Sequence, residues 1–226
     1  QPEPMKCDTL FDLASNTKMY ATNYAIMHLV YEGKLDIDKR VSYYLPEYKG
    51  CDKNNECRED RTIRNLLTHT AGYIPDPQFF NPESIKQYGS GLYSQNRNLT
   101  ESIILNKLPF AGRRGEKPNY SDVDYMLLGM VVEKITAMQL DEYVTNNIYQ
   151  PLGLQNTMYN PLKNGISKDM CAATEINGNT RSGTVYFPNI RTKPIQCEVH
   201  DEKAYYSMGG VSGHAGLFSN IEDMAV

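Results

Sequence analysis

The segment from Leu10 to Gly33 constrains the fold of this 226-residue chain more than any other. A short apolar run is followed by apolar residues at the spacing of one helix face, namely Met19, Ala21, Ala25, Ile26, Leu29 and Val30. Gly33 then suits the left-handed turn that ends many helices. We therefore expect a helix over residues 16–32, with a wide apolar face buried in the core.

A candidate nucleophile, Ser15, stands at the start of this helix, and Lys18 follows it at S-x-x-K spacing. Residues three apart on a helix have Cβ atoms about 5–6 Å apart. The first turn of a helix also favours developing negative charge. Lys18 is therefore placed to take the proton of a serine nucleophile. The structural alternative is that Ser15 caps the helix and Lys18 is a solvated helix residue.

Composition excludes several classes of protein. Hydrophobic residues make up 40% of the chain and charged residues 22%, as in ordinary globular domains. A net charge of −4 argues against a nucleic-acid partner. No apolar run approaches the roughly 20 residues that span a bilayer. Both ends look cut, because Ser15 lies so near the start and residues 221–226 resemble the first turn of an unfinished helix.

The cysteines and histidines give weaker indications. The five cysteines match no C-x-x-C pattern. Cys51 and Cys57 flank a polar loop and would form a local disulfide in an exported protein, but free thiols explain them equally well. The histidines, at positions 28, 69, 200 and 214, lack the spacing of zinc ligands, so we expect no metal site.

The rest of the chain changes character near residue 156. Helical patterns are expected at residues 62–69, 98–107, 123–135 and 140–148, and an irregular loop at 73–94. Short β-prone runs follow at 174–176, 184–187 and 197–199, and Ser219 and Glu222 have the spacing of a capping box for a terminal helix. This order predicts one partial α+β domain over 1–226, mainly helical over 1–155, with strands, loops and the start of a helix over 156–226.

Two further motifs favour ordinary turns. The glycine-rich basic stretch from Gly112 to Asn119 lacks the pattern of a phosphate-binding loop, so we expect an exposed turn. Gly210-Val211-Ser212-Gly213-His214 misses the last glycine of G-x-S-x-G, so Ser212 is expected to be a turn residue and not a nucleophile.

Five markers occur in a fixed order along the chain. They are Ser15-Asn16-Thr17-Lys18, residues 62–72 (TIRNLLTHTAG), Tyr120-Ser121-Asp122 with Leu127-Leu128-Gly129, Pro151-Leu152-Gly153-Leu154, and residues 213–219 (GHAGLFS). This series resembles the serine β-lactamase-like family of class C β-lactamases, low-molecular-mass penicillin-binding proteins and related esterases. The run Val199–Ala204 before the last marker is most similar to the type 4B branch of the penicillin-binding proteins.

The resemblance implies a β-lactamase/transpeptidase-like fold, in which a helical region packs on an antiparallel sheet, and it implies no metal or cofactor. Ser15 would be the acylated nucleophile, and Lys18 would hold or take its proton. Tyr120 resembles the tyrosine of the Y-x-N motif, which acts with the lysine as general base and returns the proton to the leaving group.

Two departures from the family pattern concern the sheet. The third motif, K-T-G or H-T-G on a late strand, is absent, and we expect it beyond Val226. The strands that precede the nucleophile in the family are also missing from this chain. The absent late strand supplies an oxyanion-hole donor in the family, and loss of one such donor costs on the order of 100-fold in rate.

Asp122 stands where many relatives have Asn. An amide there can donate to a substrate carbonyl, whereas an ionised carboxylate cannot. A lysine that serves as a base needs a pKa near about 7–8 in place of about 10.4, and a carboxylate within about 4 Å would oppose that decrease. Two hypotheses follow. Either Tyr120 is the base while protonated Lys18 stabilises its phenolate, or Asp122 turns away and caps the next helix.

The function implied by the resemblance is a serine hydrolase with an acyl-enzyme, most simply a D-alanyl-D-alanine carboxypeptidase. Its ligand would be a peptidoglycan stem peptide or a β-lactam, and its location the bacterial cell envelope, with any membrane anchor outside this chain. An esterase or a β-lactamase uses the same chemistry. A non-catalytic module that binds penicillin or peptide is the alternative from another class.

Overall fold

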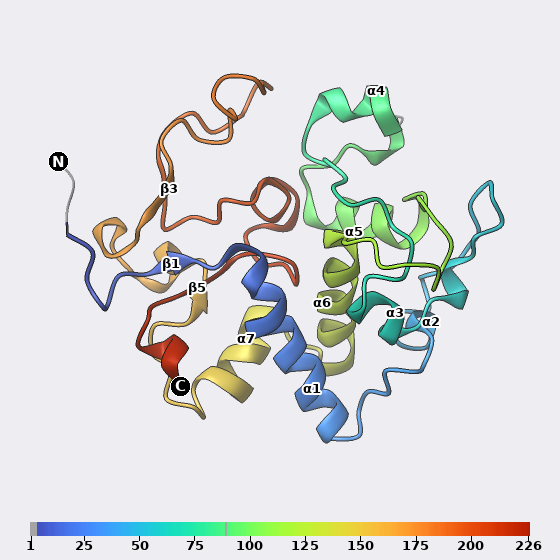
Figure 1. The fold of residues 1–226 in the computed structure, drawn as a ribbon, viewed down its shortest axis with the longest axis horizontal. Helices are drawn as coiled ribbons and strands as arrows, with labels where there is room; N and C mark the ends of the chain where they lie inside the picture. Colours follow the sequence, from blue (N-terminus) through green and yellow to red (C-terminus); the bar gives the residue numbers. More distant parts are fainter. Residues whose placement is uncertain (1–3, 89) are drawn as a thin grey trace.

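The computed structural model describes residues 4–88 and 90–226. Its helices and strands lie in different parts of the molecule (Figure 1). The helices are α1 (Tyr24–Tyr31), α2 (Val41–Tyr44), α3 (Ile63–Leu67), α4 (Ile85–Tyr88), α5 (Arg97–Asn106), α6 (Asp122–Thr136) and α7 (Leu140–Val144). The strands are β1 (Phe11–Asp12), β2 (Met158–Tyr159), β3 (Ala173–Glu175), β4 (Ile195–Gln196) and β5 (Leu217–Ser219). The predicted α+β organisation is therefore present, with helices gathered on one side and the strands on the other.

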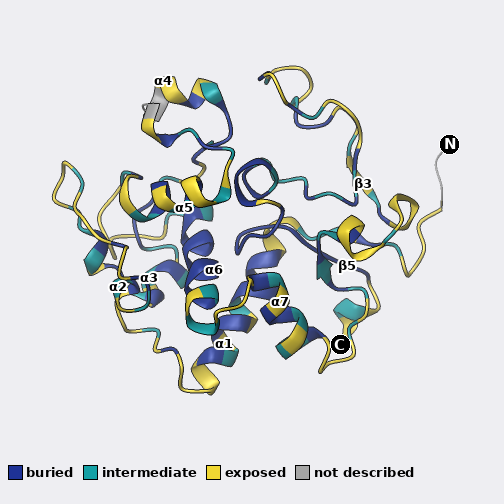
Figure 2. Cartoon of the chain, turned by 180° about the vertical axis from the view of Figure 1, so that it is seen from behind, coloured by how far each residue is buried: buried dark blue, intermediate teal, exposed yellow. Residues whose placement is uncertain are grey.

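Helix α6 lies at the centre of the helical side. Every residue from Val123 to Val132 is buried, and Figure 2 shows this part of the helix in dark blue. A helix that is apolar around its whole circumference must be covered on all sides. Helices α1, α2, α3 and α7 all pack against α6. Its N-terminal end, where Asp122 stands, is therefore held rigidly.

The predicted first helix forms as one continuous helical path. It begins with a 3-10 turn over Ala14–Asn16, continues through a π-helical stretch over Lys18–Asn23 and becomes α1. Gly33 follows with φ +69°, as expected of a left-handed stop. The expectation of a wide buried face was wrong in part, because Met19 and Val30 are 54% and 42% exposed. The buried face is narrower and consists mainly of Ala21, Ala25, Ile26 and Leu29.

The other predicted helices are confirmed with small changes in their bounds. Thr62 and Asn65 form a reciprocal capping box at the start of α3. The stretch from Gly112 to Pro118 is exposed, as predicted for a surface turn. The loop expected over 73–94 is less irregular than predicted, since it contains α4 and short 3-10 turns. Helix α7 continues as a π-helical stretch to Tyr149.

The strands were predicted less well. The main sheet has the order β1-β5-β2 and is antiparallel, with Phe11 opposite Ser219 and Met158 opposite Phe218. β3 and β4 form a separate antiparallel pair. A strand near 174–176 is confirmed as β3, but 184–187 is a turn and extended loop, and the run at 197–199 is preceded by β4 instead of forming a strand.

The predicted terminal helix is reduced to a 3-10 turn over Asp223–Ala225. The capping-box prediction was wrong, because Ser219 belongs to β5 and its hydroxyl bonds Thr157. Asn220 accepts instead from the backbone N–H of Asp223, at 2.9 Å. The short side chain of Asn220 is one residue closer to the turn than Ser219.

Two disulfides hold the loops. Cys51 and Cys57 are bonded, which decides between the two alternatives left open by the sequence. Cys171 and Cys197 are also bonded, a pairing that the sequence did not predict. The second bond joins the residues that flank the β3–β4 pair. Cys171 also forms a backbone bridge with Leu10, just before β1.

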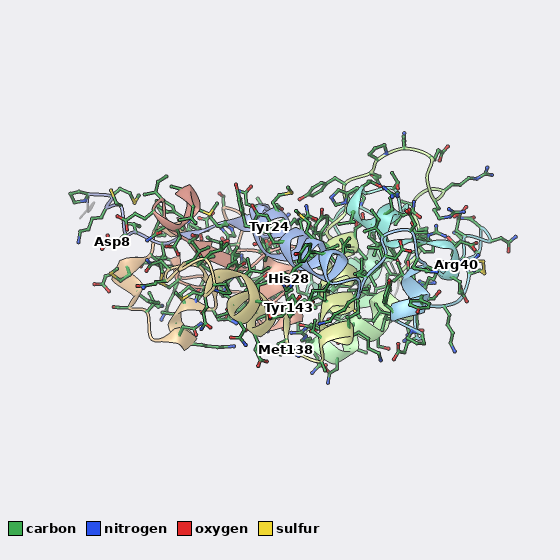
Figure 3. The ribbon with its side chains drawn as sticks, turned by 90° about the horizontal axis from the view of Figure 1, so that it is seen from below. Asp8, Tyr24, His28, Arg40, Met138 and Tyr143 are labelled. Carbon is green, nitrogen blue, oxygen red and sulfur yellow. A yellow bond between two sulfur atoms is a disulfide. The ribbon has the colours of Figure 1, made fainter. Side chains whose placement is uncertain are left out.

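Figure 3 shows how α1 meets α7 at the lower side of the molecule, where His28 and Tyr143 lie side by side. The His28 ring and the Tyr143 hydroxyl are 2.8 Å apart. Among the described residues, no helix combines the length and the hydropathy needed to traverse a lipid bilayer.

Candidate active site

Ser15 is presented by a tight connection between β1 and the first helix. Ala14, immediately before it, has φ +47°, a left-handed conformation that is strained for alanine. The Asp12 carboxylate stabilises this turn by accepting from the N–H of Ala14 at 2.8 Å, and it accepts from the N–H of His200 at 2.7 Å. Ser15 itself is exposed. The hydroxyl is thus held in place and open to a substrate.

The Lys18 ammonium lies directly behind this hydroxyl. Lys18 is 4% exposed, and its Nζ donates to Ser15 Oγ at 3.0 Å, to Asp122 Oδ1 at 2.8 Å and to the carbonyl of His214 at 3.1 Å. These three acceptors match the three donors of a lysine ammonium. The alternative of a solvated lysine was therefore wrong. Ser15 lies inside the 3-10 turn, with Leu13 at its N-cap position, so it is not a helix cap either.

Tyr120, two residues before the start of α6, lies against the Lys18 ammonium. Its ring centroid lies 4.8 Å from Lys18 Nζ, within the range of a cation–π interaction. Tyr120 is 51% exposed, so the phenol also faces solvent. The structure therefore brings together the hydroxyl, the amine and the phenol that the sequence singled out.

Asp122 contacts Lys18 and does not cap α6. The cap is Ser121, whose hydroxyl accepts from the N–H of Val123 and donates to the carbonyl of Ile74. Burial by itself would raise the pKa of Asp122, but the charges of His214, Lys203 and Lys18 outweigh burial and lower it. Asp122 is thus ionised beside Lys18, and the capping hypothesis was wrong.

The segment from Gly209 to Gly216 supplies the carbonyl that binds Lys18, and it packs very closely on α6. A Cβ on Gly213 would lie 2.0 Å from the carbonyl oxygen of Tyr125, so only glycine fits there. The carbonyl of Gly213 accepts from the Thr22 hydroxyl at 2.7 Å. These contacts fix the position of the His214 carbonyl against Lys18.

The family model described as Beta-lactamase matches residues 1–226. The chain belongs to the beta-lactamase family. It is 52% identical over 220 residues to a Salmonella schwarzengrund protein named "Putative D-alanyl-D-alanine carboxypeptidase", a match that covers 97% of this chain and 50% of that protein. The chain thus spans about half the length of the curated relatives it matches.

Solved structures agree on the fold. A penicillin-binding protein homologue from Pyrococcus abyssi superposes with a TM-score of 0.67 at 24% identity, covering 98% of this chain and 44% of that one. A penicillin-binding protein from Bacillus halodurans gives a TM-score of 0.64 at 24% identity, covering 98% of this chain and 60% of that one. The predicted β-lactamase/transpeptidase-like fold is therefore confirmed.

Sequence reasoning missed a group of buried charges behind Asp122 in this beta-lactamase-family chain. Lys203 is 3% exposed, and its Nζ lies 2.5 Å from Asp76, 3.2 Å from Asp122 Oδ2 and 3.6 Å from Asp201. Asp201 in turn bonds His214 Nε2 at 2.8 Å. The run His200-Asp201-Glu202-Lys203 was noticed only for its resemblance, although acidic and basic residues side by side before a glycine-rich turn are themselves a signal.

Ser212 extends this group but is buried, at 2% exposure, and its hydroxyl lies 2.7 Å from His214 Nδ1. Serine, histidine and aspartate side chains thus meet in a row, yet the serine is covered by protein. Ser212 itself lies in irregular backbone two residues after the turn at Gly209–Gly210, so the turn was predicted in the right stretch but not at this residue. Asp122, Asp201 and His214 could offer three ligand atoms to a cation, but the ammonium of Lys203 already lies against both carboxylates.

His69 and Asp124 form a second pair that sequence reasoning missed, and this pair lies next to Tyr120. The ring of His69 lies 4.5 Å from that of Tyr120, between centroids, and its Nδ1 is 2.8 Å from Asp124 Oδ2. Asp124 is fully buried, and burial raises its pKa to about 6 in spite of the hydrogen bond with His69. His69 has φ +55° at the end of α3, which turns its side chain back toward α6. The motif around His69 carried the family resemblance without revealing this contact.

Proposed function

We propose that this chain carries the nucleophile of a serine hydrolase that works through an acyl-enzyme, as a D-alanyl-D-alanine carboxypeptidase. The observation that supports it most is the 3.0 Å contact between Ser15 Oγ and Lys18 Nζ, with the ring of Tyr120 lying 4.8 Å from the same ammonium. A nucleophilic hydroxyl needs a partner for its proton. Lys18 contacts the Ser15 hydroxyl directly, and Tyr120 lies next to Lys18.

In this proposal Ser15 Oγ attacks the carbonyl carbon of the substrate amide, and its proton passes to Tyr120. Lys18 remains an ammonium, because it donates to three acceptors including an ionised carboxylate, and it stabilises the tyrosine phenolate. The C–N bond then breaks, and Tyr120 returns the proton to the leaving amine. Water hydrolyses the resulting ester and regenerates Ser15.

The substrate class rests on similarity to relatives. The Salmonella protein's name refers to D-alanyl-D-alanine, and the chain covers half of that protein. We propose peptidoglycan stem peptides as substrates, β-lactams as competing ligands and the bacterial cell envelope as the location. We further propose that the chain belongs to the type 4B branch of the penicillin-binding proteins, on the residues Val199–Ala204 described above.

Labelling the full-length protein with a fluorescent penicillin tests the acyl-serine step. We expect label on the wild type, none on Ser15→Ala, and wild-type label on Ser102→Ala, which changes an exposed serine on α5. Absence of label on the wild type would refute every acyl-serine mechanism.

Product analysis then separates the alternatives. Release of D-alanine from a muramyl pentapeptide indicates the carboxypeptidase, and turnover of a chromogenic cephalosporin or a p-nitrophenyl ester indicates a β-lactamase or an esterase. Stable label without any of these products would make the protein a penicillin-binding module.

A further inference from the structure

Lys203 is a buried cation that meets three different segments of the chain. Its carboxylate partners are Asp76 in the segment between α3 and α4, Asp122 at the start of α6, and Asp201 two residues before it. Burial would lower the pKa of Lys203, but the three carboxylates, Asp201 first among them, raise it well above the ordinary value. A fully buried lysine is rare unless it is paired. Lys203 is therefore a permanent positive charge behind the candidate active site.

Asp122 is shared between two ammonium groups. Its Oδ1 accepts from Lys18 at 2.8 Å, and its Oδ2 faces Lys203 at 3.2 Å. With Lys18 alone, the carboxylate would hold the proton on that amine and repel a phenolate at Tyr120. An opposite charge within about 4–6 Å shifts a pKa by roughly 1–3 units. Lys203 offsets this effect, because its charge neutralises the same carboxylate from the other side.

Further contacts of Asp201 and His214 hold Lys203 and Lys18 in place on either side of Asp122. Asp201 holds Lys203 from one side and bonds the ring of His214 at 2.8 Å on the other. The backbone carbonyl of His214 accepts from Lys18 at 3.1 Å. Lys203 and Lys18 are therefore tied to each other by two routes, through Asp122 and through Asp201 and His214.

We infer that Lys203 is a positioning residue that neutralises Asp122, so that the Lys18–Tyr120 pair releases its proton at a lower pH than Asp122 would otherwise allow. The inference deepens the proposed function, from which it takes the acid–base role of this pair. Lys203 lies behind Asp122 and acts through it, without touching the reacting atoms.

Several other groups lie around the Lys18–Tyr120 pair or, as Asp76 and Asp201 do, contact Lys203 behind it. They come from the nucleophile segment, from the end of α3, from the loop before α4, from α6 and from the segment after β4, and they are Ser15, His69, Asp76, Asp122, Asp124, Tyr125, Asp201 and His214. Replacing Lys203 alone keeps these residues in the chain but removes an ammonium partner from Asp76, Asp122 and Asp201. The charge-conserving Lys203→Arg and the double variant are therefore needed to isolate the effect that passes through Asp122.

The test uses the full-length protein with ¹³C-labelled tyrosine and lysine. NMR titration gives the midpoint of Tyr120 and Lys18, with signals assigned from Tyr120→Phe and Lys18→Arg. Wild type is compared with Lys203→Met, Lys203→Arg, Asp122→Asn and the double variant Lys203→Met/Asp122→Asn. Lys134→Met is the matched control, because Lys134 is an exposed lysine that pairs with Glu47 at the far end of α6, the helix that begins with Asp122. The pH profile of penicillin acylation is recorded in parallel.

We expect Lys203→Met to raise the titration midpoint of Tyr120 by about 1–2 pH units and to slow acylation at neutral pH about 10-fold to 100-fold. The midpoint of Tyr120 is the quantity compared in all the variants below. Asp122→Asn should lower the midpoint, and the double variant should return it close to the wild-type value. Lys203→Arg and Lys134→Met should shift it by less than about 0.5 unit. The rescue by a second substitution is a result that a merely structural role of Lys203 would not give.

A folded Lys203→Met variant with an unchanged midpoint would overturn the inference. A double variant that stays as high as Lys203→Met would also overturn it, because Lys203 would then act independently of Asp122. If Lys203→Met does not fold, the midpoints of Asp122→Asn and Lys203→Arg decide instead, and an unchanged midpoint in Asp122→Asn counts against the inference. Wild-type protein that takes no penicillin label, yet shows these NMR shifts, would refute the proposed function while the role of Lys203 stands.

Discussion

Helix α6 and the segment from Val199 to Ser219 lie against each other, but they differ in how many polar side chains they bury. Between Val123 and Val132 the buried side chains of α6 are apolar apart from Asp124, and the helix forms the centre of the core. The other segment also places Met208, Val211 and Leu217 in this core. In addition it buries five polar side chains, all in hydrogen bonds or ion pairs, namely Lys203, Ser207, Ser212, His214 and Ser219.

Apolar and charged side chains contribute differently to the stability of the fold and to the geometry of the candidate site. Apolar burial depends on area and shape and tolerates small shifts, whereas a buried charge must keep its partners at hydrogen-bond distance. Lys18 and Asp122 lie where the two regions meet. We therefore expect damage to α6 to change the free energy of unfolding without changing the pH behaviour of the site, and damage to the charged contacts of the segment 199–219 to change both.

The largest expected effect is on the apolar side. Leu127→Ala removes a fully buried side chain of α6 and should lower the free energy of unfolding by about 2–5 kcal/mol. The pH profile of acylation in the folded fraction should stay unchanged. Urea denaturation measures the first quantity, and Leu99→Ala, on the exposed side of α5, is the control. A shifted pH profile would show that the two regions are not separable.

On the polar side, Asp201→Asn breaks the contacts with His214 and Lys203 and should cost roughly 3 kcal/mol at neutral pH. Burial would raise the pKa of Asp201, but the charges of His214 and Lys203 lower it below the ordinary value of 3.8. Its contribution is therefore fully present above pH 3.8 and is lost as the pH falls below it. The stability difference from wild type should shrink between about pH 4 and pH 2. A difference independent of pH would contradict this assignment.

The two disulfides give a finer comparison. Cys171–Cys197 closes 26 residues in the strand region and Cys51–Cys57 closes 6 in the helical region. Because the entropy removed from the unfolded chain grows with loop length, replacing the first pair by alanine should cost about 3 kcal/mol and the second about 2 kcal/mol. Thermal unfolding of the two double variants measures the difference. Only the first pair should also slow acylation, since Cys171 forms a backbone bridge with Leu10 before β1. The reverse order would mean that native contacts outweigh loop length.

The helices were predictable because their signals are local. Periodicity located α5 and α6, and the caps at Thr62 and Gly33 lie within a few residues of the helices they bound. The strands have only two or three residues each, too few to show an alternating pattern, and β1 and β5 are far apart in the sequence. Pairing between distant segments leaves no local trace, so the segment 184–187 was mistaken for a strand.

The candidate site divides in the same way. Ser15, Lys18 and Tyr120 were found from spacing and from a resemblance in motifs. Asp122 was noticed, but the sequence left its orientation open, and the structure turned it toward Lys18. Lys203 was missed because a lysine in a charged run is usually solvated, and its burial comes from three carboxylates on separate segments.

The sequence by itself determined the helices, the α+β class, the family and the residue types at the candidate site, since these depend on neighbours along the chain. Only the tertiary structure decided the charge around Lys18, the second disulfide and the partners of His69. Coulomb forces and hydrogen bonds act over a few ångströms in space, and segments a hundred residues apart come within that range only after the chain has folded.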